Sequence, residues 1–170
     1  MSKTSLILHG HFYQPPRENP KTGIIPLQPS AAPWLDWNER IYSSCYCANL
    51  SSRYLDQNGR IISLTNNYAY ISFNFGATLL SWLDTHHPEV VDGLREADRM
   101  SIERLGHGNA MAQGFNHTIL PLDKKENAEL QIAWGVEDFI HHYKRDPEGM
   151  WLPECGVNET VIDLLVENGI

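Results

Sequence analysis

The chain has 170 residues, of which 42% are hydrophobic and 20% charged, the balance of one ordinary globular domain. Its formal net charge of −8 argues against a nucleic-acid binder or a binder of acidic membranes, because both need a basic surface. The apolar runs are too short for a membrane-spanning helix or the core of a signal peptide. The three cysteines are expected to be reduced thiols, so we expect a cytoplasmic protein; the composition leaves its oligomeric state open.

Strand-like and helix-like patterns alternate from the N-terminus onward. A short apolar run predicts a buried strand at residues 4–8, and a loop with six prolines follows over residues 10–36. Asp36 and Glu39 form a capping-box pattern, so a helix is expected to start there and to end at residues 58–59, an Asn-Gly pair suited to a left-handed cap.

The second half of the chain continues this alternation. The expected elements are, in chain order, a strand or packed segment at 60–64, a strand at 69–75, a short helix at 79–84, a helix from Pro88, a strand at 109–115, a helix from the capping box of Asp123 and Glu126 to about Lys144, a strand at 150–152 and a helix at 161–168 capped by Gly169. Core positions on these helices are expected at Val90, Val91, Leu94, Ile102, Ile132, Val136, Phe139 and Ile140, whereas His141 and His142 are expected to face solvent. Alternating strands and helices predict a parallel α/β fold.

Polar side chains follow two of the predicted strands. His9 and His11 come after residues 4–8 and point the same way on an extended chain, because side chains alternate with period two. Glu154 follows the strand at 150–152. The carboxyl ends of parallel strands meet at one face, where α/β sheets and barrels hold their catalytic groups. The sequence therefore predicts a shared site at this face.

Each of these residues has more than one interpretation. Glu154 can serve as a nucleophile or proton donor beside the apolar wall of Trp151, or it can stabilise the following helix through the helix dipole. His9 and His11 can bind a metal, donate hydrogen bonds to a substrate or be structural. A metal would also need carboxylate or cysteine partners at suitable spacing, and no tight second motif is present.

Neutral polar groups and aromatic rings accompany these residues. The polar side chains are Gln14, Asn116 and His117, and the rings are Tyr13, Trp34, Trp37 and Trp151. This combination suits a polyhydroxylated ligand, because neutral groups bond hydroxyls and rings offer flat apolar faces. Core packing is the alternative for each tryptophan.

Four segments together resemble the motifs of glycoside hydrolase family 57. They are residues 6–20 (LILHGHFYQPPRENP), 71–80 (ISFNFGATLL), 117–122 (HTILPL) and 149–154 (GMWLPE). The match runs over nearly the whole chain and keeps the motif order of the family. That family holds α-amylase-like hydrolases, glucanotransferases and glucan-branching enzymes.

The resemblance implies a parallel (β/α) barrel of a distorted seven-stranded type, of which residues 1–170 would form a single incomplete catalytic domain, truncated at the C-terminus. It implies a retaining mechanism on α-glucans with no metal or other cofactor, and an oligo- or polysaccharide as the partner. Glu154 matches the family's nucleophile, while the implied substrate contacts are His9, His11, Gln14, His117 and Trp151. The general acid/base, an aspartate of a further motif, would lie beyond Ile170, so this segment alone should be inactive.

Several points stay open at this stage. Many family members carry a carboxylate upstream of the histidine in the second motif, and residues 108–115 here contain no acid. The sequence also does not decide which glucan is used, or whether water or another sugar accepts the glycosyl group. The alternatives are a metal-dependent hydrolase or deacetylase that uses His9 and His11, and a non-catalytic carbohydrate-binding protein. The open strand edges of an incomplete barrel predict self-association.

Overall fold

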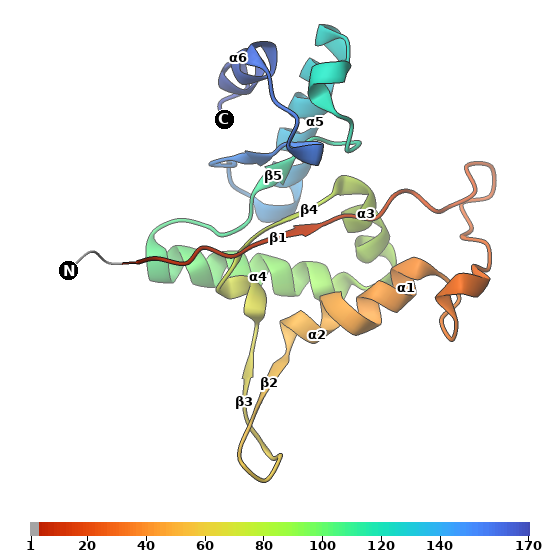
Figure 1. Ribbon diagram of the computed structural model, residues 1–170, viewed down its shortest axis with the longest axis vertical. Helices are drawn as coiled ribbons and strands as arrows, with labels where there is room; N and C mark the ends of the chain where they lie inside the picture. The colour runs from red at the N-terminus through yellow and green to blue at the C-terminus, as the bar shows by residue number, and fades with distance from the viewer. Residues whose placement is uncertain (1–3) are drawn as a thin grey trace.

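The computed structural model describes residues 4–170, and a set of parallel strands lies at its centre (Figure 1). These strands are β1 (His9–Phe12), β4 (Ser72–Phe75), β5 (Ala112–Gln113) and β6 (Met150–Trp151). β1 pairs with β4, a parallel bridge joins Phe73 to Ala110, and β5 pairs with β6. The strands follow one another in chain order and run in one direction, as at the start of a (β/α) barrel. The predicted parallel α/β layout is confirmed, and a seven-stranded barrel stays a prediction.

Helices lie between the parallel strands along the chain, and a last helix follows β6. They are α1 (Trp37–Ile41), α2 (Cys47–Leu50), α3 (Ala77–His86), α4 (Pro88–Leu105), α5 (Lys125–Tyr143) and α6 (Glu159–Glu167), with a π-helical turn at Tyr42–Tyr46 between α1 and α2. As predicted, Asp36 caps α1 by accepting a hydrogen bond from the Glu39 N–H at 3.0 Å, and Pro88 opens α4. Short 3-10 turns lie at Pro29–Ala31, Asn67–Ala69, Leu120–Leu122 and Pro153–Cys155.

An antiparallel hairpin replaces the second part of the first predicted helix. The helical segment ends at Leu50, and β2 (Ser52–Leu55) pairs with β3 (Ile61–Thr65). The hairpin projects away from the body of the molecule (Figure 1). Asp56 shapes its turn by accepting hydrogen bonds from the N–H groups of Asn58 and Arg60, both at 2.8 Å. Residues 58–59 therefore form a hairpin turn and not a helix cap, because an Asn-Gly pair satisfies either geometry.

A cluster of aromatic rings fills the core between β1, β4 and the helices. Phe12, Tyr46, Tyr68, Phe73 and Phe75 are linked by stacked and edge-to-face contacts, with ring centroids 4.6 to 6.1 Å apart. Such contacts stabilise the core beyond simple burial of apolar area. The cluster packs against Phe12 of β1, so the neighbouring residues of that strand face the other side, where the site lies.

Most of the predicted core positions are buried. Those with at most 2% exposure are Val90, Val91, Leu94, Ile132 and Phe139, and Val136 and Ile140 are half-buried. Ile102 is 40% exposed, so that prediction is wrong. Ser101 takes the inward position on α4 instead, where its hydroxyl donates to Asp98 O and accepts from the Asn109 N–H. Adjacent helix residues point about 100° apart, so Ile102 turns outward.

Residues 4–8 do not form the predicted buried strand. Leu6 and Ile7 are each 84% exposed, and β1 begins only at His9. The neighbouring strand starts at Ser72, whose N–H donates to Leu8 O at 3.1 Å. Within residues 4–170, the segment before Leu8 has no strand to pair with. An apolar run forms a strand only where a partner is available, and here the partner is too short.

Two predictions around α5 are also wrong. Asp123 does not cap this helix; its carboxylate accepts a hydrogen bond from the Thr118 hydroxyl. His142 is 4% exposed and not solvated, since its Nε2 lies 3.0 Å from Asp84 Oδ2 and its Nδ1 lies 2.8 Å from Asp138 O.

Between residues 4 and 170, no helix combines the length and the apolar character needed to cross a bilayer.

Candidate active site

Two histidines of β1 meet around one buried amide. His9 and His11 project from the same face of the strand, as predicted, and both contact Asn74 on β4. Nε2 of His9 lies 3.0 Å from Oδ1 of Asn74, and Nδ1 of His11 lies 2.9 Å from Nδ2 of Asn74. The other nitrogen of His9 lies 2.8 Å from the Ser72 hydroxyl. Asn74 is only 1% exposed, so one buried side chain fixes the orientation of both imidazoles.

One arrangement of protons satisfies the contacts of all three rings, although His11 Nδ1 also lies 3.3 Å from Asn74 Oδ1 and the Ser72 hydroxyl also reaches Leu8 O at 3.4 Å. Asn74 donates through Nδ2, so Nδ1 of His11 accepts and the His11 proton sits on Nε2. This nitrogen lies 3.0 Å from Nε2 of His117, which therefore accepts and keeps its own proton on Nδ1. His9 donates from Nε2 to Asn74 and accepts at Nδ1 from Ser72. This arrangement uses each ring with one donor and one acceptor nitrogen.

Burial keeps His11 in this neutral form. The pKa of His11 lies below its usual 6.5, mainly because burial disfavours the charged ring. The hydrogen bond with Asn74 raises the pKa, the nearby His117 and His9 rings lower it, and the negative charge of Glu154 raises it. His11 is therefore uncharged at neutral pH, and the Glu154 carboxylate lies close enough to influence its charge.

Aromatic rings cover the histidines from β6 and from the loop after β1. Trp151 stacks on His9 with centroids 4.8 Å apart and planes 11° apart, and on His11 at 4.9 Å and 20°. Tyr13 stacks on His117 at 3.9 Å and 22°. The three imidazoles are thus held between a tryptophan and a tyrosine, which fixes the ring planes as well as the hydrogen bonds.

Two buried donors at this site have no partner among residues 4–170. They are Nε2 of Gln113 and Nε1 of Trp151. Gln113 on β5 and Trp151 on β6 are opposite one another in the strand register, so their side chains share a face of the sheet. The other end of the Gln113 amide accepts a hydrogen bond from Asn74 Nδ2, which ties it to the histidine network. An unmade buried hydrogen bond is costly, and a ligand oxygen or a water would satisfy these donors.

Glu154 stands just past the carboxyl end of β6. Its backbone is left-handed, with φ +54° and ψ 20°, and Cys155 follows with φ +55°. Such a conformation costs a residue other than glycine on the order of 1–3 kcal/mol and tends to occur at functional sites. The side chain is exposed, and within residues 4–170 no ion pair or hydrogen bond engages its carboxylate. Asn158 caps α6, which begins at Glu159, so Glu154 does not hold the start of that helix.

Comparison with known proteins identifies the family. Residues 9–170 match the sequence pattern of Glycosyl hydrolase family 57. The chain belongs to this family. The resemblance seen in the four sequence motifs is thereby confirmed over almost the entire chain.

Two relatives place the chain within much longer proteins. Alpha-amylase 1 of Dictyoglomus thermophilum is 30% identical over 101 residues, which make up 59% of this chain and 14% of that protein. The crystal structure of 4-alpha-glucanotransferase from Thermococcus litoralis superposes with a TM-score of 0.63 at 20% identity, over 96% of this chain and 21% of that one. The chain shares the fold of that part of the glucanotransferase and spans a minor part of either relative's length.

Gln14 lies in a different network from the imidazoles of this family 57 chain. Its Nε2 donates to the Tyr46 hydroxyl at 3.3 Å, and its Oε1 accepts from Arg17 Nη2 at 2.6 Å. Arg17 in turn donates to Asn38 at 2.9 Å. The structure thus gives Gln14 a role in ordering the proline-rich loop, and contact with substrate stays a prediction for it.

The donor set does not resemble a metal centre. Within residues 4–170, no three His, Cys, Asp or Glu side chains come together as metal ligands would. Both ring nitrogens of His9 are engaged by Ser72 and Asn74, and Nδ1 of His11 faces an amide donor. The arrangement of His9 and His11 therefore fits hydrogen bonding better than coordination.

Sequence reasoning missed the amides that organise this family 57 site. Asn74 and Gln113 are buried in β4 and β5, where apolar side chains are the default. A signal for Asn74 was present, because it alternates with Ser72 on a strand whose other positions are aromatic. Gln113 gave no comparable signal, since its contact with Asn74 joins residues 39 apart in the chain.

Proposed function

We propose that this chain carries the nucleophile of a family 57 catalytic site that cleaves α-glucans with retention of anomeric configuration. Glu154 attacks the anomeric carbon and forms a covalent glycosyl-enzyme, which water or the hydroxyl of another sugar then cleaves. The observation that carries the proposal is the exposed Glu154 carboxylate, which has no ion pair or hydrogen bond within residues 4–170 and is held in a left-handed backbone beside the imidazole network. The substrate class follows from family membership and from the two relatives, an α-amylase and a 4-α-glucanotransferase.

The neutral network supplies the contacts that a sugar needs next to this nucleophile. With His11 as the donor in their contact, His117 carries its proton on Nδ1, and Gln113 and Trp151 each carry a buried donor without a partner in the described chain. These groups donate to sugar hydroxyls without adding charge, and the Trp151 ring offers an apolar wall. Neutral donors also leave the negative charge of Glu154 uncompensated, which preserves its nucleophilicity.

Retention needs a second carboxyl group about 5 Å from the first. The resemblance assigns this role to an aspartate of a further family motif. In the proposed cycle that group protonates the leaving oxygen and then activates the acceptor hydroxyl or water. Glu154 and the aspartate thus divide nucleophilic and proton-transfer work between two environments.

The test compares Glu154→Gln with Glu148→Gln in the full natural gene product. Glu148 is also exposed and lies near the amino end of β6, so it is a matched control away from the imidazoles. Turnover of maltooligosaccharides should fall about a thousandfold or more for Glu154→Gln and stay near the unsubstituted rate for Glu148→Gln. Nuclear magnetic resonance of the first product should show the α-anomer.

Two results would overturn this proposal. Turnover that survives Glu154→Gln would remove the residue from the mechanism, and a first product in the β-configuration would exclude retention. An unsubstituted protein that binds maltooligosaccharides and cleaves none would instead favour a non-catalytic carbohydrate-binding protein.

A further inference from the structure

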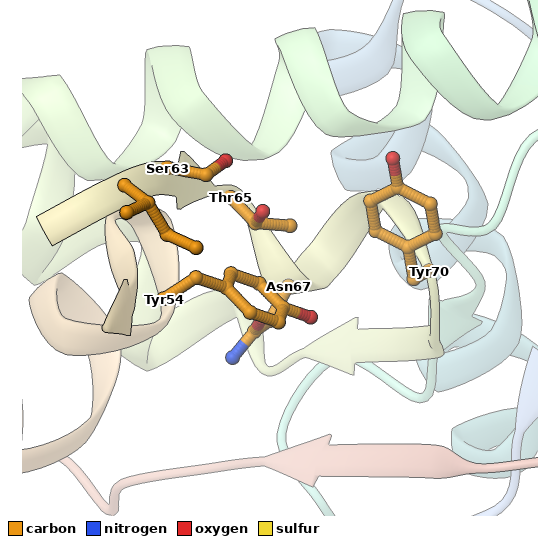
Figure 2. Close-up of a pocket in the computed structure, with 6 residues that line it drawn as sticks. Tyr54, Ser63, Thr65, Asn67 and Tyr70 are labelled. Carbon is orange, nitrogen blue, oxygen red and sulfur yellow. The ribbon is translucent and has the colours of Figure 1, made fainter. Parts of the chain in front are cut away.

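The projecting hairpin forms one wall of a pocket that is separate from the imidazole network. The cavity has a volume of about 490 Å³ and is lined by Tyr54, Ile62, Ser63, Thr65, Asn67 and Tyr70 (Figure 2). This volume falls within the range of small-molecule sites, about 300–1,000 Å³. Tyr70 precedes the amino end of β4, whereas Glu154 follows the carboxyl end of β6. Since these strands run in one direction, the pocket and Glu154 lie toward opposite ends of the strands.

The lining is neutral, hydroxyl-rich and aromatic. None of the six lining side chains carries a charge. Tyr54 is 57% and Tyr70 58% exposed, and Figure 2 shows Tyr70 standing apart from Tyr54, with Asn67 close to the Tyr54 ring. In the described chain no side-chain hydrogen bond engages the hydroxyls of Tyr54, Thr65 or Tyr70, so all three are free to bond a ligand.

Several contacts hold the pocket in shape without a ligand. The Arg104 guanidinium lies 4.5 Å from the Tyr70 ring centroid and donates to Ala69 O, which fixes one face of that ring. Asn67 donates from Nδ2 to Asn49 Oδ1 at 2.9 Å and keeps its own carbonyl oxygen available. A preformed site loses little conformational entropy on binding.

The strand register places the polar groups on one face of the hairpin. Tyr54 lies opposite Ser63, and Thr65 is two residues further along the same strand. Leu64, which is 62% exposed, alternates with these residues and does not line the pocket, although Ile62, two residues before it, does. The hairpin therefore contributes the Tyr54 ring and the hydroxyls of Ser63 and Thr65 to the pocket, and Ile62 adds an apolar side chain to the lining.

We propose that this hairpin pocket binds a segment of α-glucan chain at a second, non-catalytic site. The ligand is a neutral polyhydroxylated chain, because the pocket offers two tyrosine faces and free hydroxyls but no charge. Its identity as an α-glucan rests on the proposed function. The site tethers a long polymer while Glu154 acts on another part of it, so it raises the local concentration of substrate.

Native gel electrophoresis in amylopectin tests the proposal on the full natural gene product. All variants carry Glu154→Gln so that the polymer is not consumed. Tyr54→Ala should weaken the retardation about tenfold, while Tyr54→Phe, which keeps the ring, and Leu64→Ala, which does not line the pocket, should bind within about twofold of the parent. Hydrogen exchange with added maltoheptaose should slow in residues 52–70 of the parent and of Tyr54→Phe, and not in Tyr54→Ala.

The possible results separate this proposal from the catalytic one. Equal retardation of Tyr54→Ala and the parent, or no slowing of exchange in residues 52–70, would overturn the hairpin site. A Tyr54→Ala protein that binds glucan normally but no longer self-associates in sedimentation would also overturn the hairpin site. That result would mean that the hairpin contacts another copy of the chain. Tyr54-dependent retardation in a protein that cleaves no maltooligosaccharide would support the hairpin site and refute only the catalytic proposal.

Discussion

Asn74→Ala removes the amide at the centre of the imidazole network. Three contacts are lost, to His9 Nε2, His11 Nδ1 and Gln113 Oε1. A buried polar group left without a partner costs about 1–3 kcal/mol, and Gln113 is the most buried of the three at 5% exposure. His9 is half-buried and His11 is exposed, so water recovers part of their loss. We expect the free energy of unfolding to fall by about 3 kcal/mol in total.

Urea denaturation followed by circular dichroism measures this change, with Ser72→Ala as the matched control. Ser72 contacts only His9 within the network, so its removal should cost less than about 1 kcal/mol. Asn74→Ala should also slow turnover of maltooligosaccharides, because His11 and Gln113 lose the group that orients them. An Asn74→Ala protein as stable as Ser72→Ala and as active as the unsubstituted protein would refute the assignment of Asn74 as the organiser of the site.

The remaining predictions concern charge. Asp98→Ala should lower the free energy of unfolding by about 3–5 kcal/mol, because it leaves a buried ion pair broken. Asp98 is 2% exposed; its carboxylate accepts from Arg145 Nε and Nη2 at 2.8 and 2.9 Å and from the Ala110 N–H at 2.9 Å. A loss below about 1 kcal/mol in urea denaturation would contradict this prediction. Because the pKa of His11 is lower in the folded protein, the unfolded chain binds a proton at this residue more readily. The contribution of neutral His11 to the free energy of unfolding is therefore present above pH 6.5 and is lost as the pH falls through the pKa of His11 in the folded protein. Below pH 6.5 the free energy of unfolding should therefore change less steeply with pH in His11→Gln than in the unsubstituted protein. Equal slopes in the two proteins would contradict this prediction.

The layout of the fold could be predicted because its signals are local. Pro88 marks the start of α4, Asp36 caps α1, and period-two patterns mark β4, so the alternation of strands and helices followed from the sequence. The hairpin of residues 52–65 could not be predicted in the same way. Its apolar residues also fit a helical spacing, and the Asn-Gly pair at 58–59 suits both a helix cap and a tight turn.

The site was predictable where motifs and strand ends coincide. His9, His11 and Glu154 were predicted at the carboxyl ends of strands; Glu154 does follow β6, whereas both histidines lie within β1, where the structure places them in one network near Glu154. The buried amides Asn74 and Gln113 escaped prediction because their partners lie far away in the chain. Burial of a polar side chain is decided by such tertiary contacts, and no local pattern reports them.

The central claim is that Glu154 forms a covalent bond to the sugar. A fluorinated maltosyl fluoride that forms a slowly hydrolysed glycosyl-enzyme tests it directly, with mass spectrometry of the peptides after proteolysis of the full natural gene product. We predict one labelled peptide, which contains residues 149–156 and carries the sugar as an ester on the Glu154 side chain. Label on any other carboxylate, or no label in a protein that turns over maltooligosaccharides, would contradict the account.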